Sequence, residues 1–370
     1  MEVDAGSADA TEIDAVVPHA PYLEPRYLPD VCDVAATIPE FSVTNFGNFD
    51  TSLNNNCTGG VVAQDNGPEI CVVRYGSIHV EVAGGLTVSG SRALALVADS
   101  TISVDGILDV AAKADISGPG GGTLTSGGKV SANGGGGAGF ATAGGAGGGA
   151  TADGGGGLGG AASIDPALLT VLLGGTEPVS QPGSFMAPTV GGGGGAVTLI
   201  ACRGQVSVSG TIDAGGGGGA GGKRGFNLNP DNAYFGGAGG GAGGNVVLQG
   251  MSVVVTGQVF ANGGGGGSGM IPVAGQPGTP GNPGRNGTRS ATDAAAGGAA
   301  PGVAGAGGAG GREAVAPGRG LHPSATTGLP GGGGGSMGFF QTYTPAGVSP
   351  TLTPTAASPA FRANKVVGTR

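Results

Sequence analysis

Glycine is the residue that most constrains what this chain can fold into. It supplies 89 of the 370 residues and occurs in uninterrupted runs such as 191–195 and 263–267. Glycine loses more conformational freedom on folding than any other residue, and it is a poor helix former. The 24 prolines restrict helices further, and tryptophan is absent. A helical enzyme is therefore a poor fit, and the sequence predicts an all-β protein.

The negative charge is concentrated at the N-terminus. The net charge is −9, but residues 1–50 hold ten carboxylates against Arg26, and the rest of the chain is balanced. We interpret residues 1–30 as a solvated acidic tether. No basic stripe is present, so nucleic acid is not an expected partner, and no apolar run reaches the roughly 18 residues that a membrane span needs.

The cysteines indicate an oxidising compartment. Cys32, Cys57, Cys71 and Cys202 are even in number and lack the tight pairs that zinc sites use. We expect two disulfides, with Cys57 to Cys71 as the first choice, in an N-terminal cap over 31–77; free buried thiols are the alternative. The residues after Met1 resemble no signal peptide, so the chain is either cytoplasmic or exported with its signal removed, and we favour export.

Internal repeats are the strongest signal in the sequence. The text from Leu94, "LALVADSTISVDGILDVAA", recurs at Val197 as "VTLIACRGQVSVSGTIDAGGGGGAGG" and at Val246 as "VVLQGMSVVVTGQVFANGGGGGSG". An earlier copy begins at Ile78 and a degenerate one at Gly127. Aligning the copies places a glycine between two strand segments in each: Gly106, Gly128, Gly210 and Gly257. Alternating apolar residues predict strands with one buried face.

Such short strands bury their apolar face only by stacking on one another. We therefore predict an irregular β-solenoid-like stack over 78–350, followed by a tail over 351–370; an antiparallel sandwich is the alternative. The text after Gly338 resembles a closing strand. The predicted core is Ile78, Val80, Leu86, Val88, Leu94, Leu96, Ile102, Val104, Leu108, Val197, Leu199, Val206, Val208, Ile212, Val246, Leu248, Val253, Val255 and Val259.

Three long glycine-rich insertions interrupt the repeats, at 113–195, 215–244 and 263–335. In a polyproline-II-like helix of three residues per turn, only glycine lets neighbouring helices approach closely enough for hydrogen bonds between their backbones. The insertions therefore favour a polyglycine II bundle with few apolar side chains. Plain flexible linkers are the alternative.

Together these segments resemble a known group of proteins. The texts "GPEICVV" at 67–73, "GSRALALVADSTISVDGILDV" at 90–110 and "VVVTGQVFANGGGGG" at 253–267 are similar to glycine-rich surface proteins, mostly of lipoprotein type, of gliding and predatory soil bacteria. The resemblance covers roughly 50–350 and implies a surface location and a lipid anchor in the native precursor. It supplies no activity and no catalytic residues. In composition, the glycine tracts also resemble PE-PGRS segments and the polyglycine domains of phage tail-fibre adhesins.

One insertion differs from its neighbours because "KRGFNLNPDNAYF" places cations, aromatic rings and amides between glycine tracts. Such groups bind glycans or proteins, so we predict a binding loop; the alternative is that its aromatic residues plug the end of the bundle. The candidate residues are Lys223, Arg224, Phe226, Asn227, Asn229, Asn232, Tyr234 and Phe235. The segment "GREAVAPGRGLHPS" from Gly311 is a second, weaker candidate.

Catalytic patterns are weak. His19, His79 and His322 are far apart in sequence, and a structural role is expected for His79. Asp109 and Asp213 align between copies, which favours turn-capping rather than a catalytic row. We predict no enzymatic activity, no metal site and no cofactor.

The sequence therefore predicts an extracellular or outer-surface protein with a structural or adhesive function. One alternative is a binding module that takes a surface glycan or protein on the 223–235 loop. The other is a filament or matrix subunit whose partner is another copy of itself.

Overall fold

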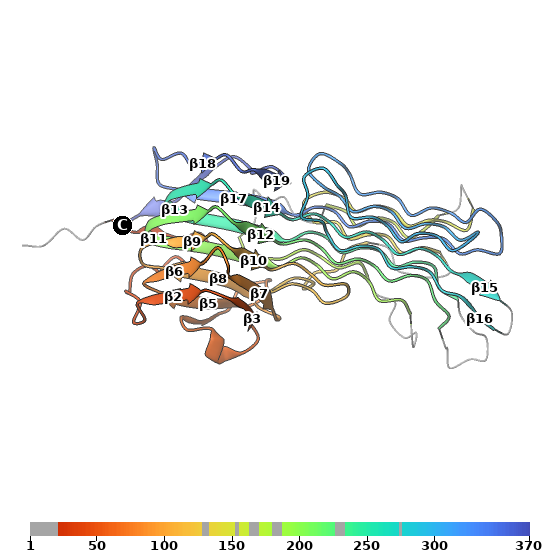
Figure 1. Cartoon of the computed structure of the whole chain (residues 1–370), viewed down its shortest axis with the longest axis horizontal. Coiled ribbons are helices and arrows are strands. Elements are labelled where there is room, and N and C mark those ends of the chain that lie inside the picture. The colour runs from red at the N-terminus through yellow and green to blue at the C-terminus, as the bar shows by residue number, and fades with distance from the viewer. Residues whose placement is uncertain are drawn as a thin grey trace, which may run out of the picture.

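The computed structural model describes residues 21–127, 133–151, 155–162, 170–179, 187–225, 234–273 and 276–370. The molecule is elongated, with the strands gathered at one end and the glycine-rich segments running side by side toward the other (Figure 1). About 32% of the chain is strand and 1% helical, so the all-β prediction is confirmed. The described residues contain one helical element, a 3₁₀ turn at Asn54–Asn56, and none of their helices could cross a membrane.

The repeats pair with one another as parallel strands. The strands of the three clearest copies are β8 (Ala93–Ala98), β9 (Ile102–Val104), β10 (Ile107–Asp109), β11 (Ala196–Val208), β12 (Thr211–Asp213), β13 (Asn245–Val255) and β14 (Gln258–Phe260). Leu94 lies opposite Val197, which lies opposite Val246, as the alignment of the copies predicts. Because the pairing is parallel, the antiparallel sandwich is wrong.

Further copies extend the stack at both ends. The earlier strands are β2 (Glu40–Val43), β3 (Phe46–Asp50), β5 (Ile70–Tyr75), β6 (Ser77–Val80) and β7 (Gly85–Ser89), and the last are β17 (Phe339–Thr344), β18 (Thr351–Leu352) and β19 (Ala356–Ser358). The sequence after Gly338 therefore forms three strands on β13 and β14 rather than one closing strand.

Shorter strands complete the sheets and the two ends of the molecule. They are β1 (Leu23–Glu24), β4 (Gly60–Val62), β15 (Ile271–Val273), β16 (Gln276–Thr279), β20 (Lys365–Val366) and β21 (Gly368–Thr369). β4 covers β5 antiparallel, β20 covers the end of β17, and β1 pairs with β21.

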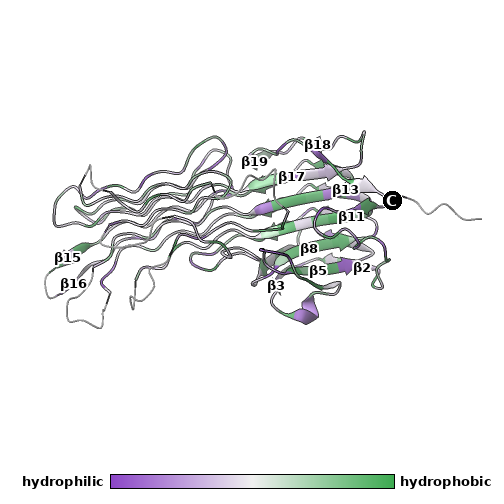
Figure 2. Ribbon diagram, turned by 180° about the vertical axis from the view of Figure 1, so that it is seen from behind, coloured by the Kyte–Doolittle hydropathy of each residue, from purple (hydrophilic) through white to green (hydrophobic). Residues whose placement is uncertain are grey.

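The core lies between a 6-stranded and an 11-stranded sheet, and the stack does not close into a solenoid; part of it is curved as a half-barrel. All the predicted core residues are buried in one cluster that both sheets line. Figure 2 shows hydrophobic residues concentrated in β5, β8, β11 and β13, whereas the projecting segments are mostly pale. Apolar burial therefore stabilises the stack but supplies little to the glycine-rich part.

The glycine that the copies share allows their turns to stack. A Cβ at Gly210 would lie 2.1 Å from the carbonyl oxygen of Gly106, and one at Gly257 would lie 2.1 Å from that of Gly210. Gly128, aligned with them from sequence, lies outside the described residues. The degenerate copy from Gly127 is not a further layer of the sheets, because its described residues Gly134 to Ala138 hydrogen-bond to other glycine-rich segments instead.

The glycine-rich segments hydrogen-bond to one another with a period of three residues. In the segment 263–269, the N–H groups at positions 263, 266 and 269 donate to carbonyls of 305–311. Those at 264 and 267 donate to 238–241, and those at 265 and 268 donate to 282–285, all at 2.8 to 2.9 Å. Successive residues therefore face three different neighbours in turn.

The carbonyl groups of the same segment accept from further neighbours. Positions 264 and 267 accept from 332–335, positions 265 and 268 accept from 219–222, and position 266 accepts from Gly298. The segments lie so close that a Cβ at Gly264 would be 1.9 Å from the Gly217 oxygen. For the described parts of the insertions, the flexible-linker alternative is therefore wrong.

Both predicted disulfides form. Cys57 and Cys71 close a loop with a sequence separation of 14, and Cys32 and Cys202 are separated by 170 residues. The second bond ties the N-terminal segment to β11. Free thiols, the alternative, do not occur among the described cysteines.

Candidate functional site

The predicted binding loop is closed at its base by backbone pairs. Arg224 and Tyr234 form an isolated antiparallel bridge, and the N–H of Phe235 donates to the carbonyl of Lys223 at 3.0 Å. The structure thus brings together four of the eight predicted residues. The other four lie outside the described residues: Phe226, Asn227, Asn229 and Asn232.

The described side chains of this loop have different roles. Phe235 is 4% exposed and packs with Val190 and Ala238, so it stabilises the loop base rather than presenting a ring to a ligand. The Tyr234 hydroxyl donates to the carbonyl of Val273 at 2.8 Å. That bond joins the loop to the β15–β16 hairpin. Lys223 is partly exposed at the loop base.

This loop base and the β15–β16 hairpin form the distal tip, which we define as residues 223–225, 234–235 and 270–279 as far as they are described. In Figure 1, β15 and β16 lie at the end of the long axis opposite the C-terminus. The first described strand, β1, pairs with the last, β21, and the N–H of Tyr22 donates to the carbonyl of Arg370 at 3.0 Å. The described chain therefore begins and ends at the same end of the molecule.

The chain end is held by charge as well as by backbone pairing. The Arg370 guanidinium pairs with Glu24 and lies 3.2 Å from Asp33 and 3.8 Å from Asp30. These contacts raise the pKa of Arg370, with the Glu24 hydrogen bond as the largest cause. Because the guanidinium is exposed, these pairs fix the position of the terminus more than they stabilise the fold.

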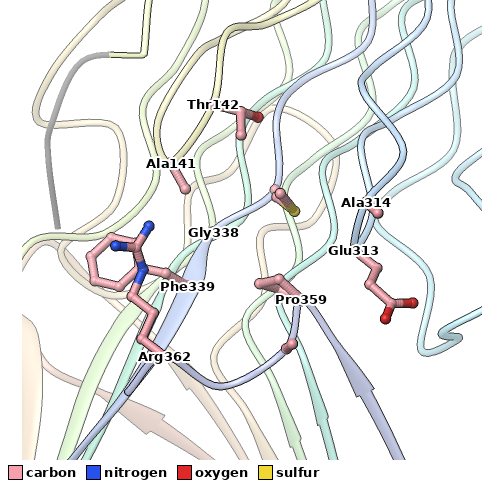
Figure 3. A pocket seen from close by; sticks show the side chains of 10 residues that line it. Ala141, Thr142, Glu313, Ala314, Gly338, Phe339, Pro359 and Arg362 are labelled. Atoms are coloured by element: carbon pink, nitrogen blue, oxygen red, sulfur yellow. The ribbon is translucent and has the colours of Figure 1, made fainter. Parts of the chain in front are cut away.

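A pocket of about 390 Å³ lies where the glycine-rich segments meet the strands, far from the distal tip. Figure 3 shows Arg362 and Phe339 on one side of this pocket and Glu313 and Ala314 on the other. The base-of-bundle pocket is lined by Ala141, Thr142, Glu313, Ala314, Met337, Gly338, Phe339, Pro359, Ala360 and Arg362. Sequence reasoning missed this pocket, although Glu313 and Ala314 belong to the weaker candidate segment from Gly311.

The aligned carboxylates cap turns, as expected. Asp109 Oδ1 accepts from the N–H of Ala111 at 3.1 Å, and Asp213 Oδ1 accepts from that of Gly215 at 2.9 Å. Arg289 lies between them, 3.1 Å from Asp109 Oδ2 and 2.7 Å from Asp213 Oδ2. Burial raises the pKa of Asp213, although Arg289 opposes the shift. The group is an ion-paired link between an insertion and two strands.

His79 has a structural setting on the outer face of the sheet. Its Nδ1 lies 2.9 Å from Ser103 Oγ on the neighbouring strand, and its Nε2 lies 3.9 Å from Glu40 Oε1. The histidine is thus hydrogen-bonded along the stack, as expected for a strand residue. His19 lies outside the described residues. Among those described, no group of three metal-ligating side chains occurs.

Comparisons with protein-family models, with curated proteins and with solved structures found no match.

Proposed function

We propose that this chain is an exported, non-enzymatic surface protein whose glycine-rich bundle holds a binding tip away from the surface to which the chain is attached. The observation that carries this proposal is the polarity of the molecule. Both ends of the described chain lie at one end, and the 223–235 loop base lies at the other (Figure 1). An adhesive protein needs this separation between attachment and contact.

The bundle suits a rigid spacer. We infer that its segments are polyglycine II helices, because a period of three hydrogen-bonding directions requires three residues per turn. We also infer that the stacked strands act as a β-solenoid-like base from which these helices leave and to which they return. The backbone hydrogen bonds between the segments, each contributing about 1 kcal/mol, would offset much of the entropy cost of ordering glycine, which is about 1 to 2 kcal/mol per residue.

Two disulfides support an oxidising compartment, and hence export to the extracellular or outer surface. Residues 21–30, which the predicted tether included, are instead part of the fold, because Leu23 and Leu28 are buried in a core cluster and β1 pairs with β21. The acidic tether, shortened to residues 1–20, would connect the folded part to its attachment point, where a lipid anchor in the native precursor is part of the proposal. The partner would be a surface glycan or a surface protein recognised by the tip.

The test is binding of labelled, oxidised protein to intact bacterial cells and to a glycan panel. In the matched variant, residues 226–233 are exchanged for a Gly/Ser sequence of the same length, and the closing residues Arg224, Tyr234 and Phe235 are kept. A control variant, Arg319→Ser with His322→Ser, changes exposed groups elsewhere. Saturable binding that only the loop variant loses would support the proposal, whereas equal binding by all three proteins would refute a role for the loop.

A filament or matrix subunit is the second candidate. The 6-stranded parallel sheet ends in edge strands, β3 on one side and β19 on the other, which occupy equivalent places in successive copies of the repeat. Such edges can pair with another copy of the chain. Sedimentation as large assemblies, with no binding to cells or glycans, would favour this function over adhesion by the tip.

A further inference from the structure

The base-of-bundle pocket has the size and composition of a small-molecule site. Its volume of about 390 Å³ falls in the range of ligand pockets. Four segments that are far apart in sequence line it: 141–142, 313–314, 337–339 and 359–362. Most of its lining residues are apolar or glycine, and the polar ones are Thr142, Glu313 and Arg362.

Arg362 supplies a positioned cation. Its guanidinium carbon lies 5.6 Å from the ring centroid of Phe339, which is itself buried and stacked on Phe140 at 5.2 Å. Within the described part of the chain, this guanidinium has no hydrogen bond or ion pair. A planar cation that stacks on a ring still presents its N–H groups to a carboxylate.

Glu313 supplies the opposite charge across the pocket. It lies in a tight turn closed by the Arg312 and Val315 bridge, with φ of +35°, a conformation that non-glycine residues rarely adopt. Its N–H donates to the buried Ser358 Oγ at 3.0 Å. The strained turn is thus tied to β19, and an exposed carboxylate is held at this side of the pocket.

We propose that this pocket binds a ligand with one carboxylate and an apolar body, whether a free acid or the C-terminus of a peptide. The carboxylate pairs with Arg362, and the apolar body covers Met337, Phe339 and Pro359. Glu313 repels a second negative charge and so selects monocarboxylates over dicarboxylates. This site is far from the distal tip and does not depend on the proposed adhesive function.

The test is a titration of the oxidised full chain with hexanoate, in which binding is measured by ligand-observed NMR and by calorimetry. We expect a dissociation constant on the order of 1 to 10 mM for so small a ligand. Hexanamide, which lacks the charge, and adipate, which has the same carbon count and a second carboxylate, should each bind about tenfold more weakly or not at all. An acetylated peptide that ends in a free leucine carboxylate, compared with its amide, shows whether a chain terminus is the better ligand.

Variants assign the effect to the pocket. Arg362→Ala should weaken hexanoate binding about tenfold or more, whereas Arg319→Ala, which removes another exposed arginine, should leave it unchanged. Glu313→Gln should bring the dissociation constant of adipate closer to that of hexanoate. Thermal melting checks that each variant is folded. Binding that persists in folded Arg362→Ala, equal binding of hexanamide, or no binding of any carboxylate would overturn the proposal.

Discussion

Gly264→Ala tests the central structural claim, that glycine is needed because backbones touch. The added Cβ would lie 1.9 Å from the Gly217 oxygen, and real Cβ contacts essentially never fall below 3.0 Å. The segment that contains Gly217 must therefore move by about 1.1 Å, the difference between these two distances. Gly155→Ala is the matched control, because a Cβ there meets nothing within 4 Å.

The magnitude follows from the two hydrogen bonds between these segments that lie nearest to the contact of Gly217 with Gly264. The N–H of Gly216 donates to Asn262 at 2.8 Å, and the N–H of Gly219 donates to Gly265 at 2.9 Å. Losing both costs about 2 to 3 kcal/mol, and the lower entropy of the unfolded alanine chain returns about 0.4 to 1 kcal/mol. The expected net loss is about 2 kcal/mol, which for a chain of this size is a fall of about 3 °C in the melting temperature.

The assay is thermal and denaturant unfolding of the oxidised proteins, with hydrogen exchange to locate the change. Amides at 216, 219, 241 and 264 should exchange faster in Gly264→Ala, while those of β11 and β13 stay protected. Gly155→Ala should be unchanged or slightly more stable. If Gly264→Ala is as stable as Gly155→Ala, the close approach of backbones is not what stabilises the bundle.

Other predictions concern covalent, electrostatic and apolar links. Replacing Cys32 and Cys202 by Ser should lower the free energy of unfolding, measured by denaturant titration, by about 5 kcal/mol according to the loop-entropy relation. Replacing the cysteines of the shorter Cys57 to Cys71 disulfide should lower it by about 3 kcal/mol. Burial raises the pKa of Asp213 in the folded state, so this group contributes less to the free energy of unfolding as the pH rises above about 4. The difference in free energy of unfolding between the wild type and Asp213→Asn should therefore favour the wild type more at pH 3 than at pH 7. The reverse order would contradict the assignment. Arg289→Ala should lower the free energy of unfolding by about 2 kcal/mol at pH 7, after discounting for the partial exposure of the guanidinium. The loss should be smaller at pH 3, where Asp213, whose pKa is raised by burial, is protonated. Phe235→Ala should cost about 3 kcal/mol and make the 223–235 segment more sensitive to protease, with Tyr234→Phe as a mild control.

The sequence alone determined the features that depend on local pattern. Alternating apolar residues identified the strands, and every core residue predicted from them lies in the observed core. The reason is that a strand places alternate side chains on one face, whatever it pairs with. The recurring glycine at 106, 210 and 257 marked the turns between strands. The even number of cysteines and their spacing favoured the Cys57 to Cys71 bond.

Other features were decided only in the tertiary structure. The sequence pattern suggested a copy at Gly127 that does not join the sheets, and it missed the full extent of the copies at 40–50 and 339–358. Hydrogen bonding to a neighbouring segment, not the local pattern, decides whether a segment joins a sheet. The ion pairs of Arg289 join one insertion to two strands, and the pocket beside Arg362 is lined by two insertions and by the chain around β17 and after β19. Their positions depend on how each glycine-rich segment leaves and returns to the stack, and a run of identical glycines carries no information about which neighbour it will face.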